Sequence, residues 1–148
     1  MSATIVDQGL LAALQGRGMV STHPVIVVAA TGNVPAYCWP MPRDPHPSTG
    51  FRIGADFGVR LAEAWKLNEA VHDGAVLTLR EDLHTPYLAA GWSFRLGPPP
   101  ASTPAALNRG SAYNSALAMS VVSGVDAVFL KSGEILTVFV DGAISLEV

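Results

Sequence analysis

The last quarter of the chain, residues 115–148, alternates short apolar runs with turn residues. The runs SALAMSVV, AVFLK, ILTVFV and AISLEV are separated by SGVD, SGE and DG. Each run has the length of a strand, and each break places Gly beside Ser or Asp, which turns favour. Asp141-Gly142 is a strong hairpin signal, because a type I′ turn needs φ > 0 at both central positions. We therefore expect four short antiparallel strands in this region.

Residues 51–61 alternate between apolar and polar positions over their whole length. The apolar positions are all odd: Phe51, Ile53, Ala55, Phe57, Val59 and Leu61. A period of two predicts an antiparallel strand with one buried face. The composition of residues 62–71, AEAWKLNEAV, favours a short helix instead. A continued strand is the alternative for that segment, because Trp65 and Leu67 keep the odd parity.

Three other apolar runs are typical of strands, at residues 25–30, 75–80 and 87–96. The parity of the apolar positions changes within the third run, which indicates an irregularity at Gly91. A shorter strand is expected over residues 36–39. Since each run is bounded by Gly, Pro, Asp or Asn, the pattern indicates a chain rich in strands.

The N-terminal region and two proline-rich stretches interrupt this pattern. Asp7 is placed to cap a brief helix through Leu14, which Gly16 and Gly18 would end. The stretches PMPRDPHP and GPPPASTP start at residues 40 and 97. Proline fixes φ and lacks a backbone donor, so both stretches are expected to be extended arms or loops.

Together these elements predict an all-β fold. We expect an antiparallel sandwich or barrel of about nine strands, jelly-roll-like, with a short N-terminal helix and proline-rich arms. The expected division is an N-terminal arm over residues 1–19 and a β-sandwich domain over residues 20–148. A chain of 148 residues is long enough to bury a substantial core as one domain.

The scarcity of charge changes the expected assembly. Charged residues make up 14% of the chain, against about 25% in typical globular proteins. We infer that much of the surface is buried against other copies or other proteins, so a homo-oligomer or a larger assembly is expected; the alternative is a monomer coated with Ser, Thr, Gly and Pro. The net charge is −3 and the basic residues are scattered, which argues against a nucleic-acid partner.

The terminus and the apolar runs bear on localisation. The first residues, MSATIVDQ, lack the basic and apolar segments of a signal peptide. The longest uniformly apolar run, residues 25–30, is far too short to span a bilayer. We therefore expect a soluble chain made in the cytoplasm, without a membrane partner.

Few residues suggest chemistry. Cys38 is the sole cysteine, which excludes an intrachain disulfide, and its apolar neighbours favour a core position over a nucleophile. Asp82 and His84 could supply two metal ligands, although solvated loop residues are the favoured interpretation. The pair His72-Asp73 would lie about 30 Å away along a straight strand, too far to share an ion with them. We expect no catalytic residue, no metal and no cofactor, and hence no enzyme.

The tryptophans are the remaining candidates for ligand contact. Trp39, Trp65 and Trp92 lie near loops or proline arms. Trp beside Pro can form a flat recognition surface for a sugar or a protein. A carbohydrate- or ligand-binding β-sandwich is therefore the alternative function, with a core position as the competing interpretation for at least two of the three.

The phrase Leu130-Lys131-Ser132-Gly133-Glu134, followed by alternating apolar residues, resembles the closing strands of trimeric jelly-roll domains of the complement and tumour-necrosis-factor type. With the proline arms and the ending GAISLEV, it is also similar to phage capsid decoration proteins. The resemblance implies a trimeric virion protein, made in a host cytoplasm, that stabilises a major capsid protein. The expected partner contacts are Leu10, Leu11, Leu14, Pro40, Pro42, Pro45, Pro47, Pro98, Pro99 and Pro100.

Overall fold

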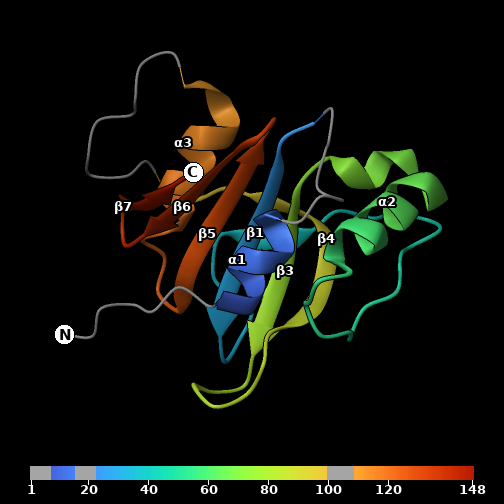
Figure 1. Ribbon diagram of the computed structural model, residues 1–148, viewed down its shortest axis with the longest axis horizontal. Coiled ribbons are helices and arrows are strands. Elements are labelled where there is room, and N and C mark those ends of the chain that lie inside the picture. Colours follow the sequence, from blue (N-terminus) through green and yellow to red (C-terminus); the bar gives the residue numbers. More distant parts are fainter. Residues whose placement is uncertain (1–7, 16–22, 100–108) are drawn as a thin grey trace.

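The computed structural model describes residues 8–15, 23–99 and 109–148, and these residues form three layers (Figure 1). The middle layer is one mixed sheet with the strand order β2-β4-β3-β1-β5-β6-β7. Helices α1 (Gln8–Gln15) and α2 (Phe57–Leu67) pack on one face of the sheet, and α3 (Gly110–Met119) packs on the other.

The sheet is mixed because one central pair of strands is parallel. The strands are β1 (Val25–Thr31), β2 (Cys38–Pro40), β3 (Ala75–Arg80), β4 (Leu88–Leu96), β5 (Val125–Ser132), β6 (Ile135–Val140) and β7 (Ala143–Glu147). β1 runs parallel to β3, and the other neighbours are antiparallel. A parallel pair needs a crossover connection. Residues 32–74 provide it, and they contain α2 and the short 3₁₀ helix η1 (Glu69–His72).

The central strands are buried on both faces, and their alternating side chains build two separate cores. Val27 and Phe129 pack with α1 and α2, whereas Val28 and Leu130 pack with α3. Each fully buried Val, Leu or Phe side chain contributes about 1.5–3 kcal/mol through the hydrophobic effect. The two apolar layers therefore hold the helices on opposite faces of one sheet.

The expected all-β sandwich or barrel was wrong, and so was the count of about nine strands: the described residues contain seven, in one open sheet. The first error lies at residues 51–61, where the odd-even alternation predicted a strand. The chain instead forms a loop and then α2. Phe57, Leu61 and Ala64 are buried at spacings of four and three residues, so one helical face meets the core. Both periods fit this segment, and contact with the sheet selected the helix.

The second error lies at the run SALAMSVV, which was expected to be a strand. Residues up to Met119 belong to α3, whose buried positions include Tyr113, Ala116 and Leu117. These side chains pack in the core between the helix and the sheet, and the ring of Tyr113 meets the ring of Phe139 edge-on at 5.0 Å. The predicted jelly-roll topology is wrong because this segment forms a helix on one face of the sheet and adds no strand to it.

Several local expectations were confirmed. α1 covers the predicted N-terminal helix, and the strands after residue 124 form the predicted hairpins. Asp141 and Gly142 have φ of 49° and 81°, as the turn between β6 and β7 requires. The register of β3 against β4 shifts on either side of Leu77, which pairs with Gly91. The predicted boundary between arm and domain lies outside the described residues.

Candidate functional site

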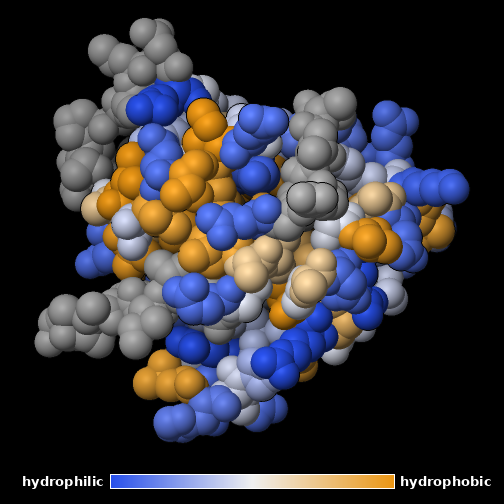
Figure 2. All heavy atoms as spheres, in the orientation of Figure 1, coloured by the Kyte–Doolittle hydropathy of each residue, from blue (hydrophilic) through white to orange (hydrophobic). Residues whose placement is uncertain are grey.

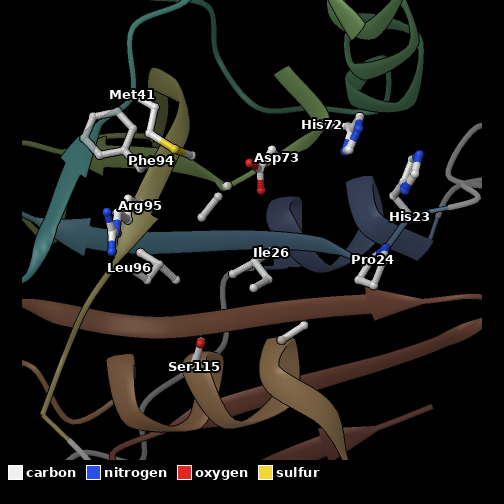
Figure 3. Close-up of a pocket in the computed structure, with 13 residues that line it drawn as sticks. His23, Pro24, Ile26, Met41, His72, Asp73, Phe94, Arg95, Leu96 and Ser115 are labelled. Carbon is white, nitrogen blue, oxygen red and sulfur yellow. The ribbon is translucent and has the colours of Figure 1, made fainter. Parts of the chain in front are cut away.

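A cavity of about 520 Å³ opens at one end of the central strands (Figure 3). Parallel β1 and β3 both begin at this end, and β4 ends here because it runs antiparallel to β3. Ile26 and Phe94 come from the sheet, and Ala112 and Ser115 come from α3. The cavity therefore lies between the sheet and α3 and collects residues from five segments of the chain.

Asp73 lies in the middle of this cavity, between η1 and β3 (Figure 3). Its side chain is 73% exposed, so the carboxylate can be reached by a dissolved molecule. Its backbone is fixed, because the Asp73 N–H donates to the carbonyl of Ala70 at 3.1 Å and the Ser93 hydroxyl donates to the Asp73 carbonyl. Asp73 thus combines an accessible carboxylate with a backbone that is held by hydrogen bonds.

Gly74, the next residue, has φ of +95° and lies close to Met41 and to the backbone of β4. A Cβ at this position would lie 2.8 Å from the Met41 Cε, 2.8 Å from the Ser93 carbonyl carbon and 2.9 Å from the Phe94 carbonyl oxygen. Only glycine combines this backbone conformation with such close approach. The start of β3 is therefore pressed against β4 beside Asp73.

Arg43 joins the first proline-rich stretch to the same point. Its Nε donates to the Ser93 Oγ at 3.0 Å, and its Nη2 lies 3.9 Å from the Asp73 Oδ2. Its side chain is 16% exposed. Ser93 has φ of +59°, which is uncommon for a residue other than glycine, and is 1% exposed. Buried Ser93 and partly buried Arg43 therefore converge on the backbone and the carboxylate of Asp73.

One end of the cavity is aromatic. The imidazole rings of His23 and His72 stack with centroids 3.9 Å apart and planes inclined by 3°. The indole of Trp65 stands edge-on to both rings, at 5.9 Å from His23 and 6.1 Å from His72. The result is a flat, weakly polar surface beside Asp73.

The other end combines a cation with apolar side chains (Figure 3). Arg95 is exposed on β4, next to Phe94 and Leu96, which also line the cavity. Met41 lies beside them. Arg43 offsets the negative charge of Asp73. The exposed guanidinium of Arg95 therefore gives this end a positive charge, which favours a negatively charged ligand group.

A second hollow of about 600 Å³ lies at the opposite end of β3 and is lined in part by Leu79, Arg80 and Leu88. Its Arg80 is already engaged. The Arg80 Nε donates to the Thr31 Oγ1 at 2.8 Å, and its Nη2 lies 3.5 Å from the Asp126 Oδ2. The first cavity is therefore the better candidate site, because its carboxylate and exposed guanidinium face open space.

The three predicted ligand-contact tryptophans lie in different environments. Trp92 is 1% exposed, stacks with Phe57 and belongs to the core. Trp39 is 46% exposed on the edge strand β2. Trp65 is partly buried and contacts the two histidines of the candidate cavity. They do not form one surface, and their roles in binding stay predictions.

The predicted partner contacts are likewise dispersed. Leu10 and Leu14 are 2% and 1% exposed and pack in the core of this chain, with Leu11 beside them. The prolines differ among themselves: Pro40, Pro42, Pro45 and Pro99 are exposed, Pro98 is partly buried, Pro47 is buried, and Pro100 lies outside the described residues. Contact with a partner through any of these residues stays a prediction.

The remaining candidates form local structure. The Asp82 Oδ1 accepts a hydrogen bond from the His84 N–H at 2.7 Å, so this pair shapes an exposed turn. Within the described ranges, no three His, Cys, Asp or Glu side chains are grouped to hold a metal ion. Burial raises the pKa of the Cys38 thiol, in line with its predicted core position. No described helix is both long and apolar enough to cross a bilayer.

Sequence reasoning missed the residues that converge on Asp73. His72-Asp73 was noticed only as a pair at one end of a strand, and Arg43, Ser93 and Arg95 were not singled out. One signal was available: Asp73-Gly74 directly precedes an apolar strand, and this order places a carboxylate at the end of a sheet. The links to Arg43 and Ser93 span 30 and 20 residues and depend on the strand order.

The surface bears on the expected assembly. Hydrophobic residues gather over the part of the molecule that holds β5, β6 and β7 (Figure 2). Exposed large hydrophobic residues in the C-terminal part of the chain are Val121, Ile135, Ile144 and Val148. The homo-oligomer, with a trimer favoured, stays a prediction.

Comparison with known proteins gives likeness in three dimensions only. No protein-family model matches the sequence, and no curated protein matches it. The fold is similar to a solved structure of a hypothetical membrane spanning protein from Bacillus cereus, with 17% identity and a TM-score of 0.56. That match covers 90% of this chain and 58% of the other, so this chain spans under two thirds of the Bacillus protein's length. A structure of DacA from Staphylococcus aureus, a double mutant, has 17% identity and a TM-score of 0.47, covering 91% of this chain and 79% of that one.

These findings overturn the interpretation as a phage capsid decoration protein or other virion component. The C-terminal phrase that carried it, from Leu130 to Glu134, forms an ordinary hairpin between β5 and β6. The hairpin belongs to an open mixed sheet with helices on both faces, and not to a jelly roll. The chain therefore shares its fold with the Bacillus cereus protein, and that fold is an open mixed sheet with helices, not a jelly roll.

Proposed function

We propose that this domain binds a small anionic molecule with a flat ring, of the nucleotide class, in the cavity around Asp73. The observation that carries the proposal is the position of Asp73 between a cationic end at Arg95 and an aromatic end at His23 and His72. A carboxylate accepts hydrogen bonds from hydroxyl or N–H groups, which such molecules carry.

The size and lining of the cavity support this choice. A volume of about 520 Å³ lies within the range of about 300–1,000 Å³ that small-molecule sites occupy. Apolar side chains of Met41, Phe94 and Leu96 offer a wall for a ring, and a few polar groups converge beside them. Binding sites commonly combine an apolar lining with a few directed polar groups.

The charge distribution supports an anionic ligand. Arg95 is exposed at the cavity, and Arg43 lies behind Asp73 with little exposure. A guanidinium suits a phosphate or carboxylate group because its fork can donate two parallel hydrogen bonds. The fold likeness contributes nothing to the ligand class, since 17% identity relates the folds alone.

Titration calorimetry with AMP, adenosine and ribose 5-phosphate tests the proposal. AMP should bind more tightly than either fragment, because it alone supplies both the ring and the anion. D73N should weaken AMP binding about tenfold, because the amide keeps one acceptor oxygen but loses the negative charge that strengthens the hydrogen bond. D82N is the matched control, since Asp82 serves an exposed turn and the amide oxygen can still accept from His84. Equal affinity for AMP and ribose 5-phosphate, or no binding by any of the three, would contradict the proposal.

The expectation that the chain is not an enzyme forms part of this proposal. The ligand recovered after prolonged incubation should be chemically unchanged by chromatography. Conversion of AMP by the wild type and not by D73N would replace a binding role with a catalytic one.

A further inference from the structure

We infer that Arg43 and Ser93 are positioning residues that hold the Asp73 carboxylate in one orientation, ready to receive a hydrogen-bond donor of the ligand. The role in binding rests on the proposed function, whereas the orientation of Asp73 is a property of the free protein. The inference makes the first proline-rich stretch, through Arg43, part of the site.

Ser93 has an unfavourable backbone conformation. Ser93 adopts φ of +59° inside β4, where an ordinary residue would be extended. Its hydroxyl donates to the Asp73 carbonyl and accepts from the Arg43 Nε at 3.0 Å. The backbone conformation brings the Ser93 Oγ to a point where it serves two partners from distant segments.

The guanidinium of Arg43 is held by the groups around it. Its Nη1 donates to the Pro42 carbonyl at 2.9 Å, and its Nη2 lies 3.8 Å from the Met41 Sδ and 3.9 Å from the Asp73 Oδ2. Its three hydrogen bonds, to Ser93, Pro42 and Met41, fix a planar guanidinium, which a flexible lysine could not reproduce. The guanidinium is thus held before any ligand arrives.

Arg43 and Ser93 are far less exposed than Asp73. Arg43 is 16% exposed and Ser93 is 1% exposed, but the Asp73 side chain is 73% exposed. An exposed carboxylate normally samples several rotamers, and burial cannot restrict this one. Its orientation is therefore set by the fixed backbone and by attraction to the held guanidinium.

Arg60 and Asp56 provide a matched comparison within the same chain. Their Nε and Oδ2 atoms lie 2.9 Å apart, but both side chains are largely exposed and belong to one helical turn. Neither residue lines the candidate cavity. Changing Arg60 therefore removes a guanidinium–carboxylate contact without affecting Asp73.

The test begins without ligand. Three-bond couplings measured by NMR should show one χ1 rotamer for Asp73 in the wild type and in R60M. In R43M the same couplings should average over rotamers. Ser93→Gly is the second variant, because glycine accepts φ of +59° and keeps the fold while removing the hydroxyl. A single unchanged Asp73 rotamer in both R43M and Ser93→Gly overturns the inference.

The second arm uses AMP and a double-mutant cycle. R43M should weaken AMP binding about tenfold in the wild type and less than about twofold in the D73N background, because coupled residues are not additive. A purely structural role, or direct contact of Arg43 with AMP, predicts equal loss in both backgrounds and overturns the positioning role in binding. If the wild type binds no AMP, the proposed function fails, and the couplings alone still decide whether Arg43 and Ser93 orient Asp73.

Discussion

His23 and His72 come from segments 49 residues apart, and their imidazole rings stack within 3.9 Å. His23 lies just before β1, and His72 ends η1. Trp65 meets both rings edge-on. The stack therefore ties the crossover segment to the start of the central strand at the mouth of the cavity.

Replacing His23 by alanine should lower the free energy of unfolding by about 1 kcal/mol, because an aromatic pair is lost. It should also change the emission of Trp65, which loses one of its two ring contacts. Urea denaturation and tryptophan fluorescence measure the two effects. H84A is the control, since His84 lies in an exposed turn. Equal stability of H23A and H84A would contradict this role of the stack.

Gly74→Ala should destabilise the protein by about 2–4 kcal/mol, combining positive-φ strain with overpacking against Met41 and β4. Gly133→Ala is the matched control. Gly133 has φ of +60°, but a Cβ there meets nothing within 4 Å, so only the backbone strain of about 1–2 kcal/mol remains. Urea unfolding with a common m-value measures the difference. Similar losses in the two variants would show that close packing at Gly74 contributes little.

The sequence and the structure agree where one local signal is sufficient. Asp141-Gly142 specified its turn, and β5 and β6 followed from runs too short for helices. They disagree at Phe57, where the sequence fits two periods and packing against the sheet decides between them, and at Ala116, where a short apolar run before a turn belongs to a helix. The site was largely beyond prediction because Arg43, Asp73 and Ser93 meet only once β3 and β4 are adjacent.

Asp126 should be the most sensitive carboxylate for stability among those with described contacts. Its Oδ2 accepts from the Thr31 and Tyr87 hydroxyls, both at 2.6 Å, and lies 3.5 Å from the Arg80 Nη2. D126A should cost about 2–3 kcal/mol, because three donors lose a partly buried acceptor. D56A is the control and should cost less than about 0.5 kcal/mol, since its ion pair is exposed. Thermal and urea unfolding compare the two, and equal losses would contradict the network's contribution.

Cys38 should make stability depend on pH in the alkaline range. Burial raises the pKa of its thiol above the ordinary value of 9.0, so the unfolded chain loses this proton before the folded chain does. The contribution is complete below the unfolded value and is lost as pH rises toward the folded value, because the unfolded state then binds fewer protons. Urea unfolding between pH 8 and 10 (about one unit on either side of the unfolded value) should therefore show a steeper decline in the free energy of unfolding for the wild type than for C38A.

The thiol should also react slowly with a disulfide reagent at neutral pH, since Cys38 is 7% exposed and its hydrogen bond to the Pro35 carbonyl keeps it turned inward. Parallel pH profiles for the two proteins, together with rapid labelling, would place the thiol in solvent instead.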